Sequence, residues 1–272
     1  MRRGFVRLDR ALSKLGFASR AEAQRLIAAG RVSVDGRTIL DPAHAVVPER
    51  ARLVVSGNPV VRSAWRLIAF HKPRGVVTTR HDPEGRRTVF DVLGPDGDGL
   101  VAVGRLDLAS TGLLLLTTDT KLADRLTDPA NAIVRRYVVT ARGAVSDESI
   151  ARLMAGVEGL KAASVRLRKR SQRETHLVVE LTEGKNREIR RIFTAVGHEV
   201  TKLMRVAFGT IELGALQPGE WREVTRDEAE RTVQSARANR VGDGADRHGR
   251  VHGAHAAAGD RPARAGSSRA RR

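Results

Sequence analysis

One acidic residue in this sequence lies between two apolar runs, where a carboxylate could take part in chemistry. Residues 101–119 contain an alternating apolar stretch, then a turn that carries Arg105 and Asp107, then four consecutive leucines at 113–116. This pattern predicts a strand, a loop and a second, buried strand. A carboxylate in such a loop loses hydration unless a cation or several N–H donors hold it, so Asp107 is either bound structurally or used as a reactive group.

An aspartate before an apolar run is often only a turn or cap residue, so the surrounding residues must distinguish the two interpretations. Gly-Arg-Leu-Asp at 104–107, followed by Thr-Gly-Leu-Leu-Leu-Leu-Thr at 111–117, resembles the catalytic motif of RNA pseudouridine synthases, in particular the RsuA/RluB family, which modifies ribosomal RNA. The resemblance implies that Asp107 is the essential catalytic residue and that Arg105 fills the space left by an extruded base. The family usually has threonine three residues after the aspartate, and Ser110 keeps the hydroxyl here.

A second segment, residues 71–77, follows a predicted buried strand at 67–70. It resembles the first motif of the same family, an Asn-Lys-Pro-x-Gly stretch, with His71 in place of the common asparagine. The resemblance favours an RNA-facing role for Lys72 and Arg74. An ordinary pair of charges at a strand end is the alternative.

Residues 183–193 resemble the family's third motif. We expect a helix there, because apolar residues recur on one helical face: Ile189, Ile192, Phe193 and Val196. Arg190 borders this face, whereas Arg187 and Arg191 point roughly opposite to it, toward solvent or RNA, and Lys185 precedes them as a further RNA-binding candidate. In the family an arginine directly after Ile or Val pairs with the catalytic aspartate, so the resemblance implies that Arg190 keeps that carboxylate ionised.

The single tyrosine of the chain, Tyr137, lies in an alternating segment at 135–140 that predicts a further strand. In the family a tyrosine at the start of this strand lies against the target uracil, so the resemblance implies a catalytic-site role for Tyr137. A half-buried tyrosine that satisfies its hydroxyl at a sheet edge is the alternative.

Residues 7–55 form a separate unit in the sequence. Leucines at helical spacing predict a first helix, Ser19 and Glu22 predict a capping box that opens a second, and Asp35-Gly36 predicts a two-residue hairpin turn. The segment resembles the RNA-binding domain first seen in small-subunit ribosomal protein four. That resemblance, rather than a merely solvated basic face, implies that arginines of this unit meet RNA phosphates: Arg7, Arg20, Arg25 and Arg31.

The composition excludes several classes of protein. The 272 residues carry a formal charge of +18, which predicts attraction to a polyanion and favours nucleic acid. No apolar run is long enough to cross a bilayer and the N-terminus lacks the apolar core of a secretory signal, so we expect a cytoplasmic protein without membrane contact. Because cysteine, phosphate-binding glycine loops and dinucleotide fingerprints are absent from the sequence, we expect neither a metal nor a cofactor.

These patterns divide the chain into an RNA-binding domain at 7–55, a linker at 56–65, a catalytic domain at 66–235 and a disordered basic tail at 236–272. Nine arginines and three aspartates give the tail a net charge of +6, so it could act as an electrostatic tether. A glycine-rich stretch at 85–99 predicts a long loop beside the cleft. We expect an α+β fold whose catalytic domain has a mostly antiparallel mixed sheet.

Together these features predict a monomeric, cofactor-free pseudouridine synthase that acts on ribosomal RNA or a ribosomal subunit precursor. The resemblance favours 23S RNA of the large subunit, but small-subunit relatives share the motifs, so a 16S-specific synthase is an alternative. A non-catalytic ribosome-assembly factor or RNA chaperone on the same scaffold is the rival from another class. An RNA methyltransferase would need a glycine-rich methyl-donor site, which we do not find. The sequence leaves open whether Asp107 attacks the ribose, attacks the base or eliminates a ribose proton.

Overall fold

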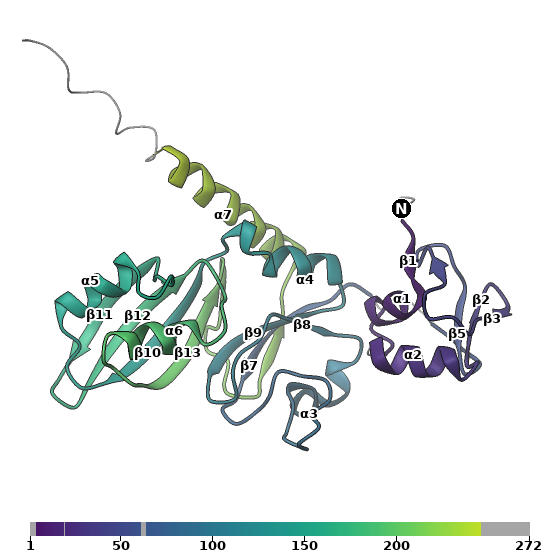
Figure 1. Cartoon of the computed structure of the whole chain (residues 1–272), viewed down its shortest axis with the longest axis horizontal. Coiled ribbons are helices and arrows are strands. Elements are labelled where there is room, and N and C mark those ends of the chain that lie inside the picture. Colours follow the sequence, from purple (N-terminus) through teal and green to yellow (C-terminus); the bar gives the residue numbers. More distant parts are fainter. Residues whose placement is uncertain (1–3, 19, 61–63, 246–272) are drawn as a thin grey trace, which may run out of the picture.

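The computed structural model describes residues 4–18, 20–60 and 64–245. Figure 1 shows a small N-terminal unit of helices and short strands beside a larger unit that is built on one extended sheet. None of the helices in these ranges has the length and apolar character needed to span a bilayer.

The N-terminal unit packs two short helices against short strands. An apolar cluster that includes Leu8, Leu12 and Ile27 joins them, and the first two of these residues have the helical spacing seen in the sequence. Ser19, which we expected to cap the second helix together with Glu22, lies outside the described residues. The elements of this unit are β1 (Val6–Arg7), α1 (Leu8–Lys14), α2 (Arg20–Ala28), β2 (Val32–Val34), β3 (Arg37–Thr38), β4 (Ala45–Val46), β5 (Leu53–Val55) and β6 (Asn58–Pro59).

The predicted hairpin between β2 and β3 is confirmed. Val34 pairs with Arg37, which leaves Asp35 and Gly36 as the two turn residues. Both have positive φ angles, 51° and 84°. A two-residue turn of this kind requires such angles, and Asp-Gly is a sequence that tolerates them.

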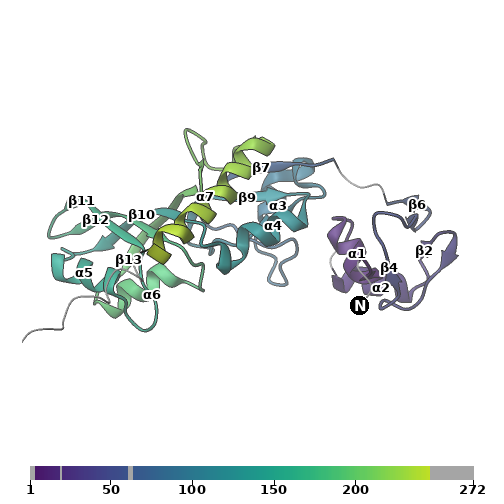
Figure 2. The ribbon, with the colours of Figure 1, turned by 90° about the horizontal axis from the view of Figure 1, so that it is seen from above.

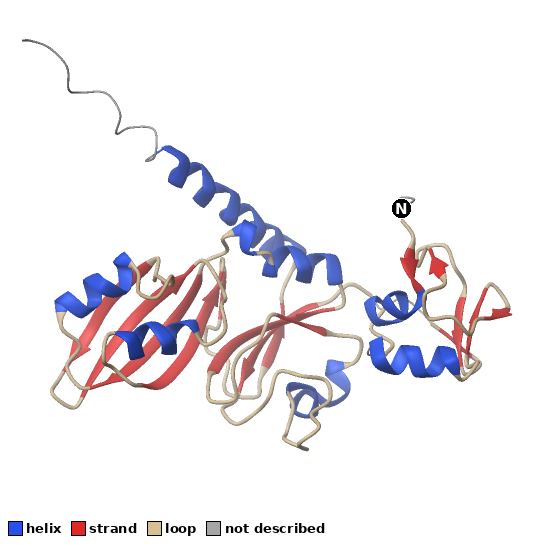
Figure 3. Cartoon of the chain, in the orientation of Figure 1, coloured by secondary structure: helices blue, strands red, loops and turns tan. Residues whose placement is uncertain are grey.

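The larger unit is organised by a nine-stranded mixed sheet (Figure 3). Its strands are β7 (Leu67–Lys72), β8 (Val101–Val103), β9 (Thr111–Thr117), β10 (Arg135–Arg142), β11 (Ser164–Arg170), β12 (Glu174–Leu181), β13 (Val200–Phe208), β14 (Ile211–Glu212) and β15 (Trp221–Glu223). Their order is β11-β12-β10-β13-β9-β7-β15, with β14 on β13 and β8 on β9. Only β9 and β13 pair in parallel within this sheet, so the predicted α+β class with a mostly antiparallel sheet is confirmed.

Helices cover both faces of this sheet, so its central strands are buried on both sides. The helices are α3 (Val89–Leu93), α4 (Thr120–Thr127), α5 (Asp147–Ala155), α6 (Glu188–Ala195) and α7 (Arg226–Ala245), with 3-10 turns η1 (Gly94–Gly97) and η2 (Pro129–Asn131). On β9, Leu114 and Leu116 join an apolar cluster with α3, α5 and α6, whereas Leu113 and Leu115 join a second cluster with α4 and α7. Figure 2 shows these helices and β9 from above. Burial on both faces explains the unbroken run of leucines.

The glycine-rich stretch at 85–99 is not one long loop, and the prediction is wrong there. It contains α3 and η1. Thr88 and Asp91 form a capping box in which each side chain accepts the backbone N–H of the other residue. This pair is the helix-start signal in the sequence, with aspartate where glutamate is more usual.

The predicted disordered tail overlaps α7. This helix runs through Ala245, so residues 236–245 are helical rather than part of the tail. Alanine and arginine in this stretch are good helix formers, and α7 begins on the apolar cluster through Ala229 and Val233. Residues 246–272 lie outside the described residues.

Candidate active site

Asp107 lies in the loop that joins β8 to β9, and hydrogen bonds inside the loop fix its backbone. The Ser110 amide donates to the Asp107 carbonyl at 3.0 Å. The Thr78 hydroxyl lies 2.9 Å from the Leu106 carbonyl oxygen and 3.3 Å from the Leu106 amide nitrogen. Asp107 is half-buried in the wall of a cavity of about 620 Å³. Asp107 is the first residue of a turn, as the structural alternative had it, but its carboxylate oxygens make no hydrogen bond in the described part of the chain, so the side chain caps nothing.

This cavity lies where β9 and β13 pair in parallel. The pairing is short and joins Met204 with Thr111 and Arg205 with Gly112. Gly112 has a φ angle of 101°, and a Cβ atom there would clash with the Arg205 carbonyl oxygen. Only glycine allows the two strands to approach this closely. The approach brings the Asp107 loop against the strand that carries Arg205.

Lys72 is not RNA-facing, which corrects the interpretation of the sequence. Its side chain is fully buried, and its ammonium donates to the carbonyl oxygens of Pro73 at 3.0 Å and Ser110 at 2.8 Å. On β7 it pairs with Gly112, which brings it to the base of the Asp107 loop. Burial lowers the pKa of Lys72 to about 8, and the negative charge of Asp107 opposes this shift. Lys72 is therefore a buried cation that acts electrostatically on Asp107.

The direct ion pair between Arg190 and Asp107 that the resemblance implied is not present. Arg190 Nη1 instead donates to the Val200 carbonyl oxygen at 2.6 Å, and its Nε is buried without a partner in the described residues. The acceptor, Val200, is the first residue of β13, which begins shortly after α6 ends. Arg190 and Asp107 still interact at longer range: burial and the nearby Arg187 lower the pKa of Arg190, whereas Asp107 raises it.

Tyr137 is buried in the cavity wall, with 8% of its surface exposed. It lies on β10, which pairs with β12 on one side and β13 on the other, so the alternative of a tyrosine at a sheet edge is wrong. The part of the wall that clusters with it is apolar and includes Leu106, Leu181, Ile189 and Leu203. Such a wall can hold a planar base away from bulk water.

Two buried arginines in the same cavity were not predicted as site residues. Arg135 begins β10 and Arg205 lies on β13, and they are 6% and 3% exposed. Side chains alternate along a strand, and Arg205 has the same phase as the buried Leu203 and Ala207. A charged residue at an inward-facing position of a strand is therefore the sequence feature that could have identified Arg205 as a site residue.

The exposed basic residues divide into two groups. Arg105, Lys185 and Arg187 are exposed and line the cavity, so the structure brings these three RNA-binding candidates to the carboxylate. Arg74 and Arg191 are exposed outside the cavity wall. Contact of these five residues with RNA stays a prediction.

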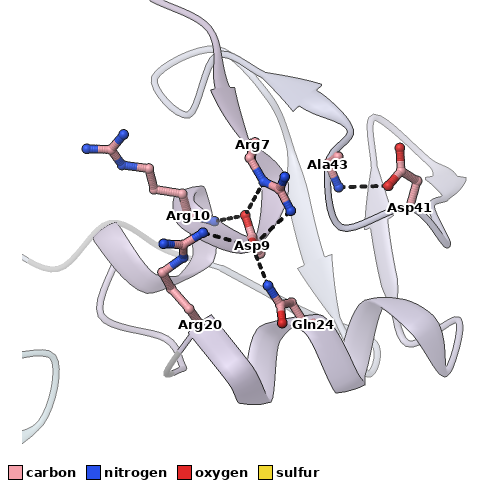
Figure 4. A network of polar contacts seen from close by, with 7 residues as sticks. All are labelled: Arg7, Asp9, Arg10, Arg20, Gln24, Asp41 and Ala43. Carbon is pink, nitrogen blue, oxygen red and sulfur yellow. Dashed lines mark hydrogen bonds and ion pairs between the residues drawn. The ribbon is translucent and has the colours of Figure 1, made fainter.

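In the N-terminal unit a buried carboxylate, Asp9, holds two of the candidate arginines (Figure 4). It accepts hydrogen bonds from Arg7 at 3.2 Å and Arg20 at 3.4 Å. Gln24 and the Arg10 amide donate to it as well, each at 2.7 Å. Burial raises the pKa of Asp9, but hydrogen bonds from Gln24 and Arg7 help to lower it to about 2. The candidate arginines of this unit are all exposed: Arg7, Arg20, Arg25 and Arg31.

We expect Asp9→Asn to lower the free energy of unfolding of the N-terminal unit by about 1–3 kcal/mol. A neutral amide cannot replace a carboxylate that accepts hydrogen bonds from charged donors. Since the folded pKa is lowered, the stabilisation is complete above the ordinary pKa of 3.8 and is lost as the pH falls toward about 2. Urea unfolding between pH 2 and 7 measures this. The matched control is Asp41→Asn, since the exposed Asp41 carboxylate accepts one hydrogen bond among the described residues, from the Ala43 amide (Figure 4). Equal pH dependence in both variants would contradict the expectation.

A second cavity, of about 510 Å³, lies between the two units of the chain. Arg10, Lys14 and Arg20 line it from the N-terminal unit, and Arg105 and Thr127 line it from the larger unit. Arg105 and Thr127 also line the first cavity, so the two cavities adjoin at these residues. A basic surface therefore extends from α1 to the Asp107 loop.

The sequence matches two family models. Residues 66–195 match the model for RNA pseudouridylate synthase, and residues 6–50 match the model for the S4 domain. The first match includes Asp107, Tyr137 and Arg190. The two matches correspond to the larger unit and the N-terminal unit described above.

Individual relatives extend this similarity along the chain. A Yersinia pestis protein named ribosomal large subunit pseudouridine synthase B is 39% identical over 230 residues, which are 80% of this chain and 72% of that protein. A protein of the same name from Escherichia coli (strain K12) is 40% identical over 229 residues, covering 80% and 79% of the two chains. A solved structure described as a crystal structure of pseudouridylate synthase has a TM-score of 0.58 at 25% identity, and covers 84% of this chain and 99% of that chain.

Proposed function

This chain belongs to the RNA pseudouridine synthases of the RsuA/RluB type, and we propose that it converts one uridine of large-subunit (23S) ribosomal RNA to pseudouridine. The names of both curated relatives support the large subunit as the source of the RNA. The basic N-terminal unit, with its S4-domain match, supports RNA as the ligand. We further propose that the protein works as a monomer in the cytoplasm, where ribosomal RNA is made.

The proposed reaction is an internal rearrangement of one nucleotide. The bond between ribose C1′ and uracil N1 breaks, and a bond between C1′ and C5 forms. C5 releases its hydrogen as a proton, and N1 takes up a proton, so atoms and charge balance without another reactant. The detached uracil must stay in place and turn between the two steps, which requires a closed, apolar pocket.

The observation that carries this proposal is the state of Asp107. Its carboxylate faces a cavity whose volume falls in the range of about 300–1,000 Å³ that is typical of small-molecule sites. Lys72 and Arg190 compensate its charge from nearby, yet neither bonds to its oxygens. We assign to this anionic carboxylate the attack on the ribose or the base, or the removal of a ribose proton, because all three routes need a charged group that is free to react.

We assign the other cavity residues to holding the nucleotide. Tyr137 would lie against the uracil ring, with the apolar wall around it retaining the base. Arg105 is exposed at the junction of the two cavities and would fill the stack after the base leaves it. Lys185 and Arg187 would contact the RNA backbone at the cavity entrance.

Incubation of the purified protein with unmodified 23S and 16S transcripts tests the proposal. Carbodiimide labelling followed by primer extension reports each pseudouridine as a stop. We expect one new stop in 23S RNA and none in 16S RNA. A stop only in 16S RNA would support the small-subunit alternative. No stop in either RNA, nor in subunit precursors, together with defective subunits in a deletion strain, would support the non-catalytic assembly factor.

A further inference from the structure

We infer that Arg205 and Arg135 form a subsite for one backbone phosphate of the substrate RNA, next to the target nucleotide. This inference rests on the proposed function for the identity of the RNA. It assigns a role to two buried cations that the chemistry at Asp107 does not use.

The first argument is that the Arg205 guanidinium is buried with most of its donors unused. Its Nε donates to the Leu113 carbonyl oxygen at 2.7 Å, which anchors the side chain across the junction of β9 and β13. Its Nη2 is shielded from solvent and has no partner in the described residues. Since buried polar groups are nearly always paired in native proteins, an unpaired donor group in a cavity wall indicates a missing acceptor.

The second argument is the charge of the pair. The guanidinium carbons of Arg135 and Arg205 lie 5.0 Å and 5.4 Å from the centre of the same Phe208 ring. Arg135 Nη1 donates to the Thr182 carbonyl oxygen at 3.0 Å, a neutral acceptor. In the part of the chain that the structure describes, neither arginine forms an ion pair. Two buried cations in the wall of one cavity need a negative charge, because buried charges are normally paired.

The pKa of Arg135 agrees with this view. Burial lowers it, and the positive charge of Arg205 lowers it further, so the two cations repel each other. Tyr137 and, less strongly, Glu188 oppose the shift, and neither forms a hydrogen bond with the guanidinium in the described residues. An anion between the two arginines would remove this repulsion.

A phosphate fits this site better than a carbonyl of uracil. Guanidinium groups present paired N–H donors that match phosphate oxygens, and one phosphate compensates charge that a neutral carbonyl cannot. The RNA supplies phosphates on both sides of the target nucleotide. Exposed Lys185 and Arg187 line the same cavity, so the backbone would already be near.

The test uses RNA oligonucleotides that contain the mapped target uridine and a single uncharged methylphosphonate at one phosphate near it. We expect Arg205→Gln to weaken binding of the unmodified RNA about ten- to a hundredfold, the effect of losing a charge-assisted contact. One methylphosphonate position should weaken binding of the parent by a similar factor and have no further effect on Arg205→Gln. Arg205→Lys should keep part of the affinity. The control is Arg166→Gln on β11, an exposed arginine of the same sheet, which should bind as the parent does.

Two results would overturn the subsite. One is unchanged binding by Arg205→Gln, and the other is a further loss for this variant at every methylphosphonate position. Circular dichroism identifies a variant that fails to fold, in which case Arg135→Gln replaces it in the same experiment. If the parent forms no pseudouridine, the proposed function fails. In that case the salt dependence of RNA binding decides the subsite. Loss of one phosphate contact in Arg205→Gln should reduce the slope of log K against log salt concentration by about 0.7–0.9.

Discussion

Asp107→Asn is expected to reduce pseudouridine formation at least a thousandfold and to leave RNA affinity within about threefold of the parent. Asparagine keeps the size of the side chain but removes the charge that each proposed route requires, and the loss of a reacting group costs several powers of ten in rate. Affinity should persist because phosphates are bound by basic side chains, and this substitution leaves all of these in place. Single-turnover primer extension measures the rate, and filter binding measures the affinity.

The matched control for this variant is Glu148→Gln, which removes one exposed negative charge from α5. It should turn over like the parent. Activity of Asp107→Asn within tenfold of the parent would reject the assignment of this carboxylate. If RNA affinity fell by the same factor as the rate, Asp107 would instead be a residue that binds RNA.

Lys72→Met is expected to lower activity at least tenfold at pH 7. Methionine keeps the length of the side chain but removes the cation near Asp107 and the donor for two carbonyl oxygens, those of Pro73 and Ser110. Each buried acceptor left without a donor costs about 1–3 kcal/mol. Activity measurements and urea unfolding test the two effects separately, with Lys121→Met, an exposed lysine on α4, as the control.

The pH dependence gives this second prediction a distinctive sign. The pKa of Lys72 is about 8 in the folded protein and near its ordinary value of 10.5 in the unfolded chain. Between these values the unfolded chain binds more protons, so this group makes the folded protein more stable as the pH rises. Activity should fall over the same range, because the ammonium near Asp107 is lost. Lys72→Met should show neither change; a parent whose activity is constant from pH 7 to 10 would contradict the role of the cation.

Local sequence patterns predicted most of the fold. Alternating or continuous apolar residues located β7, β8, β9 and β10, and Asp35-Gly36 located the hairpin because its positive φ angles suit few residue pairs. The capping box at Thr88 and Asp91 was present in the sequence, but the glycines after it suggested a loop. The length of α7 depends on the packing of its first turns against the apolar cluster. The composition of the tail, rich in glycine and arginine, gives no sign of this packing.

The candidate site was predictable where one residue determines the chemistry and less so where tertiary contacts do. The loop of Asp107 followed from the runs on either side of it. The local sequence around Lys72 is typical of an exposed charge at a strand end. It does not show that β7 pairs with β15 on one side and with β9 on the other. The partner of Arg190 depends on the course of β13, which is also not local. Arg205 could have been found from its inward phase on its strand.

The central claim is that the Asp107 carboxylate isomerises a uridine held in the cavity, and release of the hydrogen from uracil C5 tests it most directly. RNA labelled with tritium at this position is mixed with excess enzyme, and the tritium that enters water is counted. The parent should release one tritium per target uridine and Asp107→Asn should release none while it binds the same RNA. Equal release by both proteins would show that another group carries out the reaction.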